Sequence, residues 1–295
     1  MTMRTGAPVV VGVDGSASAL YAVEAAAAEA VLRHRPLKIV HVYPWPSNGV
    51  ALSPSLAATA DATLRRSSAE ILQDAAQHAA KAAPDLVGDL HTITGQPARA
   101  LLQLSEEAAL LVLGARGTGG FAGMTLGSVA AHTALHASCP VLLVRGVTGD
   151  GPVVVGADGS PSSVAACEFA ADEADRRGAE LVVLHAWTPA HATELNAGLP
   201  MSYEAWSGEE EHRRVLAEAV AGLVEQHPGL RIRRQVREGM ARKLLTDWSH
   251  EAQLVVVGSR GHGGFAGLLL GSVSQHLIYR AGCPIAVVRP AQVLA

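Results

Sequence analysis

Short apolar runs alternate with longer stretches of mixed polarity along the first half of the chain. Five runs rich in valine, leucine and isoleucine predict strands at residues 8–13, 37–43, 89–94, 110–114 and 140–145. The stretches between them predict helices from Ser16 to about Arg33, around 56–75, and near 97–108 and 126–137. The run 110–113 is apolar throughout, which is typical of a strand covered on both faces. The alternation predicts a parallel α/β sheet with right-handed crossovers.

Single residues refine two of these helices. Ser16 is a candidate N-cap for the first helix, and its counterpart in the second half, Ser160, precedes Pro161, a residue favoured at the first helical position. Small and medium apolar residues at spacings of three and four predict the buried face of the second helix: Leu56, Ala60, Leu64, Ser67, Ile71 and Ala75.

The whole pattern recurs in the second half of the chain. VVVGVDGSASA at 9–19 returns as VVVGADGSPSS at 153–163, and SCPVLLVR at 138–145 returns as GCPIAVVR at 282–289. The offset is 144 residues each time, which is the length of a domain rather than of a solenoid repeat. Glycine, proline and aspartate between the copies mark a linker. We therefore predict two domains, 1–147 and 151–295.

Composition narrows the class of protein. The chain has 295 residues, of which 49% are hydrophobic and 17% charged, so it is expected to fold and not to be mainly disordered. The net charge is −4 with no dense basic run, which disfavours a nucleic-acid partner.

Cysteine usage and hydropathy bear on the compartment. The three cysteines are odd in number and far apart, unlike a secreted disulfide framework, and the N-terminus lacks a signal-peptide pattern. An uncharged stretch from Gly117 to Val144 has the length of a membrane span, but glycines, histidines and Pro140 interrupt it. We predict a cytoplasmic protein with no membrane segment.

Two positions in each half carry candidate binding chemistry. Val13-Asp14-Gly15 follows the first strand, and Ala157-Asp158-Gly159 follows its repeat. In an open parallel sheet, ligands bind at the carboxyl ends of the strands, so Asp14 and Asp158 are candidates for contact with a ribose hydroxyl or an adenine amino group. Asp-Gly is equally a common turn.

The second candidate is a glycine pattern after the fourth strand of each half. Gly114-x-x-Gly117 is followed after nine residues by Gly127-Ser128, and Gly258-x-x-Gly261 by Gly271-Ser272. Glycines let backbone amides approach an anion, and a Gly-Ser at the start of a helix offers further donors, so phosphate binding is indicated. The alternative is a flexible loop with a glycine that only packs.

Together these residues resemble the universal stress protein family, in its ATP-binding, tandem two-domain form. The resemblance covers about 7–146 and 151–290 and implies, in each domain, a five-stranded doubly wound parallel sheet of order 3-2-1-4-5. It also implies ATP between strands one and four, contacted by Val13, Asp14, Val42, Gly114, Arg116, Gly117, Gly127, Ser128 and Val129, and by Ala157, Asp158, Ala186, Gly258, Arg260, Gly261, Gly271, Ser272, Val273 and Ser274.

The resemblance further implies a non-enzymatic, nucleotide-dependent regulator of stress adaptation. Its expected partners are an adenine nucleotide, with Mg²⁺ entering alongside the phosphates, a second copy of the chain in a homodimer, and an unidentified regulatory protein. A slow ATPase or another adenine-nucleotide enzyme is the alternative, and a module that has lost nucleotide binding is a third. Ala130 replaces Ser274, and Val42 replaces Ala186, in the first half, so we expect the two sites to differ in affinity.

Other polar residues are weaker candidates. His132 and His136 have a zinc-like i, i+4 spacing without a third ligand, and Arg116 and Arg260 suit either phosphate or solvent. Two further pairs are expected to be structural: hydrogen-bonded histidines and buried thiols, at His41, His185, Cys139 and Cys283.

Overall fold

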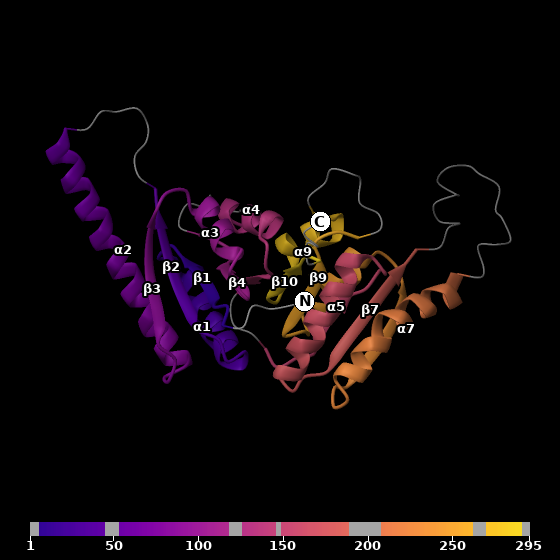
Figure 1. The fold of residues 1–295 in the computed structure, drawn as a ribbon. Helices are drawn as coiled ribbons and strands as arrows, with labels where there is room; N and C mark the ends of the chain where they lie inside the picture. The colour runs from indigo at the N-terminus through magenta and orange to yellow at the C-terminus, as the bar shows by residue number, and fades with distance from the viewer. Residues whose placement is uncertain are drawn as a thin grey trace, which may run out of the picture. The chain divides into compact units, whose positions relative to one another are not determined.

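The computed structural model describes residues 6–44, 53–117, 126–145, 149–188, 208–261 and 270–290. The chain divides into two compact units, Thr2–Val147 (the first unit) and Thr148–Ala295 (the second unit). Figure 1 shows helices packed along strands in each of them. None of the described helices is long and apolar enough to cross a bilayer.

The first unit follows the predicted order of strands and helices. Its sheet has the order β3-β2-β1-β4-β5, and the strand pairs are parallel, with Val9 opposite both Leu37 and Leu110. The elements are β1 Val9–Val13, α1 Ala17–Leu32, β2 Leu37–Tyr43, α2 Pro54–Ala82, β3 Gly88–Thr94, α3 Pro97–Ser105, β4 Leu110–Gly114, α4 Ser128–His136 and β5 Val141–Val144.

The second unit repeats this topology in the order β8-β7-β6-β9-β10, with Val153 opposite both Leu181 and Leu254. The predicted α/β fold, with strand order 3-2-1-4-5 in each domain, is confirmed. The elements are β6 Val153–Gly156, α5 Pro161–Arg176, β7 Leu181–Trp187, α7 Gly208–Gln226, β8 Ile232–Glu238, α8 Ala241–Trp248, β9 Leu254–Gly258, α9 Ser272–Arg280 and β10 Ile285–Val288.

Helices cover both faces of each sheet. In the first unit α1 packs against α2 and α3 against α4, and in the second α5 packs against α7 and α8 against α9. The central strands β4 and β9 are buried at all four of their apolar positions, as their sequences predict. The buried side of α1 is mostly alanine, which lets this helix lie close to the sheet.

The predicted N-caps are confirmed. Ser16 Oγ accepts a hydrogen bond from Ala19 N at 3.2 Å, and Ser160 Oγ accepts one from Ser163 N at 3.2 Å, with Pro161 opening α5. Both helices that leave the first strand of a unit therefore satisfy one of their free amides with their own serine.

The predicted face of α2 is partly wrong. Leu56 is 55% exposed and Ser67 is exposed, whereas Ser68 is fully buried. Ser68 can lie inside because its hydroxyl is 2.8 Å from His41 Nδ1 and 3.0 Å from Thr92 Oγ1. Hydrophobicity alone could not place a hydrogen-bonded serine on the inner face. The buried positions are Ser68, Leu72, Ala75 and Ala79.

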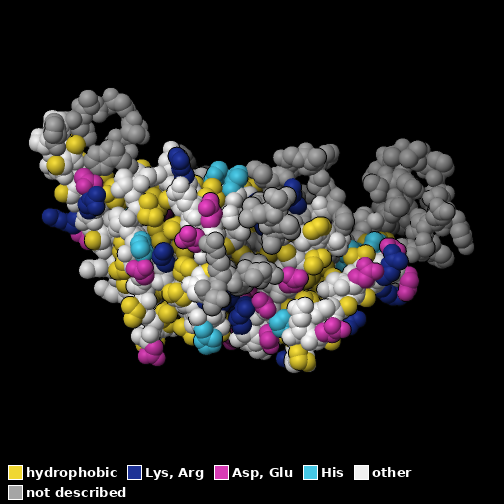
Figure 2. All heavy atoms as spheres, viewed as in Figure 1, with side chains coloured by type: hydrophobic (Ala, Val, Ile, Leu, Met, Phe, Trp, Pro, Cys, Tyr) yellow, Lys and Arg dark blue, Asp and Glu magenta, His cyan; other side chains and the backbone are white. Residues whose placement is uncertain are grey.

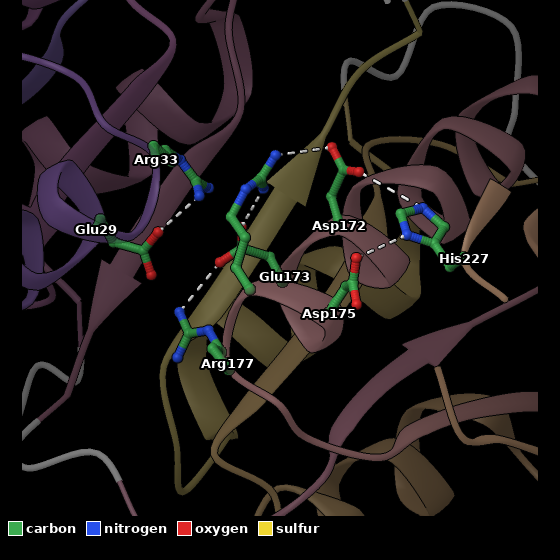
Figure 3. Close-up of polar contacts among 8 residues, drawn as sticks. Glu29, Arg33, Asp172, Glu173, Asp175, Arg177 and His227 are labelled. Atoms are coloured by element: carbon green, nitrogen blue, oxygen red, sulfur yellow. Dashed lines mark hydrogen bonds and ion pairs between the residues drawn. The ribbon is translucent and has the colours of Figure 1, made fainter. Parts of the chain in front are cut away.

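Each unit carries an ion pair with a buried glutamate near the end of the helix that follows its first strand. In α1, Arg33 Nη1 lies 2.9 Å from Glu29 Oε2, and both side chains are at most 4% exposed. At the end of α5, Arg177 Nη2 lies 3.1 Å from Glu173 Oε2 (Figure 3). Arg176 Nη1 lies 3.0 Å from Glu173 Oε1. On the face in Figure 2, the described acidic and basic side chains are interspersed.

Candidate functional site

The chain turns sharply at the carboxyl end of the first strand of each unit. Gly15 has φ +82° and Gly159 has φ +81°, a conformation that suits glycine. In the second unit Ser160 N donates to Asp158 Oδ1 at 3.0 Å, and in the first Ser16 N donates to Asp14 Oδ1 at 3.0 Å. The aspartates therefore form the Asp-Gly turn that the sequence allowed as the alternative to ligand contact.

The other carboxylate oxygen of each aspartate lies against the glycine loop. A Cβ built on Gly261 would collide with Asp158 Oδ2, and one on Gly117 would collide with Asp14 Oδ2. Neither glycine has a φ in the left-handed region. These glycines are thus needed for close approach to the aspartate and not for a left-handed backbone.

Gly114 and Gly258 are constrained by helix packing. A Cβ on Gly258 would lie 2.7 Å from Ser162 O in α5, and one on Gly114 would lie 2.6 Å from Ser18 O in α1. At Gly271, by contrast, an added Cβ would make only ordinary contacts, the nearest at 3.5 Å. Gly271 is therefore not explained by packing, which leaves room for the ligand interpretation.

The helices that begin at these last glycines have no side-chain cap. Gly271 is the N-cap of α9 and Gly127 that of α4, and neither helix has a side-chain cap hydrogen bond. Backbone contacts fix the start of each helix, because Gly271 N donates to Ser259 O and Gly127 N to Ala115 O, both at 2.8 Å. The first-turn amides of α9 and α4 thus lack the serine acceptor that α5 and α1 have.

A cavity of about 190 Å³ opens at these strand ends in the second unit. The structure brings together there every residue that the sequence predicted for this site: Ala157, Asp158, Ala186, Gly258, Arg260, Gly261, Gly271, Ser272, Val273 and Ser274. Apolar side chains form one wall and the uncapped start of α9 another. The arrangement offers an apolar surface beside a set of backbone donors.

Six lining residues were missed by the sequence reasoning: Gly156, Ser163, Leu184, Ala241, Leu245 and Val257. Two of these, Ala241 and Leu245, come from α8, which follows a turn at Gly239 with φ +137°. Gly95 occupies the same place in the first unit, with φ +147°. The recurrence of this glycine 144 residues apart was the signal that could have pointed to α8.

The role expected for Ser274 needs correction. Its side chain is buried, and its hydroxyl donates to Gly258 O at 2.6 Å. A hydroxyl has one proton to donate, so this hydrogen bond ties α9 to the end of β9 and leaves none for a phosphate. Its counterpart in the first unit, Ala130, is also buried. The two units therefore differ here in whether a side-chain hydrogen bond ties the last helix to the end of the fourth strand.

The first unit places its predicted residues on the same elements. Val13 ends β1, Asp14 follows it, and Val42 lies in β2. Ser16 Oγ donates to Arg116 O at 3.3 Å, which joins the first turn to the glycine loop. The remaining residues lie at the end of β4, just after it, or at the start of α4: Gly114, Arg116, Gly117, Gly127, Ser128 and Val129. The loop glycines at 119, 120, 263 and 264 lie outside the described residues.

The histidines at the ends of β2 and β7 are hydrogen-bonded, as expected. His41 Nδ1 contacts Ser68 Oγ, and burial lowers the pKa of His41 while the nearby charge of Asp14 raises it. His185 Nδ1 donates to Ala157 O at 2.7 Å. His132 and His136 stack on each other, with ring centroids 4.2 Å apart.

The thiols of Cys139, Cys167 and Cys283 are buried. Burial raises the pKa of both Cys139 and Cys167 to about 12, which makes them poor nucleophiles. Among the described residues, no group of three or more histidine, cysteine, aspartate or glutamate side chains could hold a metal ion. Arg116 and Arg260 are exposed, and Arg260 lines the cavity.

Comparison with known proteins agrees with this geometry. The model of the universal stress protein family matches residues 7–145 and 151–289. A universal stress protein of Mycolicibacterium smegmatis is 37% identical over 301 residues, covering 96% of this chain and 97% of that protein. One from Mycobacterium tuberculosis is 36% identical over 298 residues, covering 95% and 96%.

Solved structures agree on the fold. A universal stress protein from Archaeoglobus fulgidus superposes with a TM-score of 0.72 at 19% identity, covering 97% of this chain and all of that one. A putative universal stress protein from Pseudomonas aeruginosa has a TM-score of 0.59 at 16% identity, covering 96% and 92%. The family match extends over both units and the curated relatives over nearly the full length, so the chain belongs to the universal stress protein family, in its tandem two-domain form.

Proposed function

We propose that each unit binds an adenine nucleotide, ATP in the first instance, at the carboxyl ends of its first and fourth strands. The uncapped first turn of α9 at the edge of the cavity is the observation that carries this proposal. Free amides and the positive end of a helix dipole attract phosphate, and no side chain of α9 competes for them.

The apolar part of the cavity suits a base. Leu184 and Ala186 from β7, Leu245 from α8 and Val257 from β9 line it. A flat aromatic base would gain from burial against these side chains. Asp158 is positioned at the same wall, with one oxygen held by Ser160 N, as an acceptor for a sugar hydroxyl or an exocyclic amine.

The donor set also fits a magnesium ion carried by the nucleotide. Asp158 is the single carboxylate among the described lining residues, and Mg²⁺ is commonly held by one or two carboxylates together with substrate phosphates. The ion would neutralise phosphate charge. Asp158 and, in the first unit, Asp14 are the residues that would contribute an oxygen ligand.

The biological role that follows is regulation by nucleotide occupancy. A bound nucleotide would bridge the turn after β6, the glycine loop after β9 and the start of α9, and so fix their relative positions. A second copy of the chain, or a regulatory protein partner, would bind differently to the nucleotide-bound and the nucleotide-free protein. We place the protein in the cytoplasm, where ATP and reduced cysteines are both found.

Binding is tested by calorimetric titration with ATP, ADP and AMP, with hydrolysis followed in the same samples. Gly271→Glu puts a carboxylate at the N-cap of α9, where it favours the helix but competes with phosphate. Gly271→Ala is the matched control, because its Cβ has room. We expect Gly271→Glu to remove one site and Gly271→Ala to retain it. Equal affinity in both variants would contradict the proposed site, and ATP turnover at a steady rate would favour the enzyme alternative.

A further inference from the structure

In the second unit an imidazole of β7 touches an imidazole of α7, a pair that is absent at the equivalent positions of the first unit. His185 Nε2 lies 3.0 Å from His212 Nδ1, and the two ring centroids are 5.0 Å apart. His212, in the first turns of α7, also stacks on Trp187, with centroids 5.0 Å apart and ring planes at 24°. The residue equivalent to His212 in the first unit is Ser68.

This pair lies behind the cavity, on the other face of the sheet. Leu184 and Ala186 of β7 line the cavity, so the alternating residues His185 and Trp187 face α7. His185 nevertheless reaches the cavity wall through its other nitrogen, because Nδ1 donates to the carbonyl oxygen of Ala157 at 2.7 Å. Ala157 directly precedes Asp158, and both line the cavity.

The hydrogen bonds limit how many protons the pair can hold. A carbonyl only accepts, so His185 Nδ1 carries a proton, and its Nε2 must accept from His212 Nδ1 as long as His185 is neutral. One added proton fits, since it can go to the outer nitrogen of His212. A second added proton would set two N–H groups against each other at 3.0 Å, and the rings would have to separate.

Groups of both kinds surround the pair, and for His212 those that favour the uncharged ring prevail. Burial lowers the pKa of His212, His185 lowers it further, and Glu211 on α7 opposes them. β8 places Val236 opposite His185, and Asp158 follows the carbonyl that His185 holds. The acidic residues of α5 that contact α7, Asp172 and Asp175, reach His227 near the other end of that helix (Figure 3). His212 thus binds a proton less readily than a free histidine, and the hydrogen-bond geometry admits a second proton only when the rings separate, so falling pH favours separation.

The first unit replaces this contact with one that tolerates either charge state. His41 Nδ1 is 2.8 Å from Ser68 Oγ, and a hydroxyl can donate to a neutral nitrogen or accept from a protonated one. Asp14 also favours the charged form of His41. The hydrogen bond can therefore persist when His41 gains a proton.

We propose that the His185–His212 pair makes the second site acid-sensitive: the uncharged pair holds the Ala157 carbonyl and the wall of the cavity in place, and the doubly protonated pair releases them. This proposal rests on the proposed nucleotide function of that cavity. His212 is a positioning residue that acts through His185. The second unit then loses nucleotide at acidic pH while the first unit retains it.

The test uses the full chain with Gly127→Glu, which confines binding to the second unit. ATP affinity is measured at about pH 8 and about pH 5.5, with the pair intact and with His212→Ser, the residue of the first unit. The chain with the intact pair is expected to lose about tenfold in ATP affinity between about pH 8 and about pH 5.5. At about pH 8 the His212→Ser chain is expected to bind ATP within about twofold of the intact chain, and at acidic pH it is expected not to share the tenfold loss. Titration of ATP itself affects both proteins equally and cancels in the comparison.

The outcomes separate this inference from the function on which it rests. Equal losses in both proteins, or no loss in either, would overturn the acid-sensitive pair and leave nucleotide binding intact. Absence of binding at about pH 8 would overturn the proposed second site itself. Circular dichroism at both pH values checks the fold. If His212→Ser is unfolded, His212→Asn, which keeps a hydrogen-bonding side chain without a charge, takes its place with the same expected result.

Discussion

Gly117 and Gly261 illustrate how a single residue can be identified for one reason and required for another. Their recurrence in both halves and their place in a glycine pattern pointed to the loop. The sequence could not reveal that each faces the carboxylate of the aspartate at the end of the first strand, because that contact joins residues about a hundred positions apart. Ser274 shows the same limit, since its partner is a backbone carbonyl.

Replacing Gly261 with alanine should therefore displace Asp158, because the new Cβ collides with its carboxylate. We expect nucleotide affinity of the second unit to fall at least about tenfold and stability to fall by at most about 1 kcal/mol, because the clash is with the end of a partly exposed side chain. Titration calorimetry and thermal unfolding measure the two effects. Gly271→Ala, which has room for its methyl group, is the control, and an unaltered affinity in Gly261→Ala would contradict the contact.

The buried thiols give a second prediction for single residues. Since burial raises the pKa of Cys139 and Cys167 to about 12, almost no thiolate is present near neutral pH. Both cysteines should resist alkylation by iodoacetamide in the native protein and react once it is denatured. Peptide mass spectrometry identifies the sites. Rapid native modification of either would show that its surroundings open readily.

Strands and helices were the best predicted part of the molecule, because each carries its own periodic pattern. The central strand run 110–113 and the serine caps of α1 and α5 needed no tertiary information. The buried face of α2 was predicted wrongly because the burial of Ser68 depends on hydrogen bonds to His41 on β2 and Thr92 on β3. Likewise, α8 was not assigned to the site because its residues reach the cavity only through the fold.

The ion pairs of α1 and α5 should matter far more than those on the surface. Glu173 is 2% exposed and contacts two arginines, whereas Glu211 and Arg214 form an exposed pair at 2.7 Å. Glu173→Ala removes the buried carboxylate that both Arg176 and Arg177 contact, while each arginine keeps another hydrogen bond, so we expect a loss of about 1.5–3 kcal/mol in unfolding free energy. Glu211→Ala is the comparison, with an expected effect of at most about 1 kcal/mol. Urea denaturation measures both, and equal effects would contradict the distinction.

Duplication shapes the molecule as a whole. The sequence revealed both copies and predicted their shared topology. Because the offset is 144 residues, each residue of one unit can be compared with its counterpart in the other. We propose that the apolar last strand of each unit is covered by a partner strand, because an apolar edge strand left open favours aggregation. We also propose that chains associate as homodimers.

Separate expression of residues 1–147 and 151–295 tests this pairing. Each half should associate with itself or with the other half, because either contact covers the apolar edge strand. Analytical ultracentrifugation of each half, of their mixture and of the full chain measures the association. Two soluble monomeric halves with no mutual affinity at high micromolar concentration would contradict edge pairing.

Native mass spectrometry of the full chain titrated with ATP addresses nucleotide binding by the duplicated site most directly. Both units have a glycine loop against an aspartate and a helix that starts without a side-chain cap. The expected result is two adenine nucleotides per chain, reduced to one by Gly271→Glu and to none when Gly127→Glu is added. A folded chain that carries no nucleotide at saturating ATP, or occupancy that these substitutions leave unchanged, would contradict it.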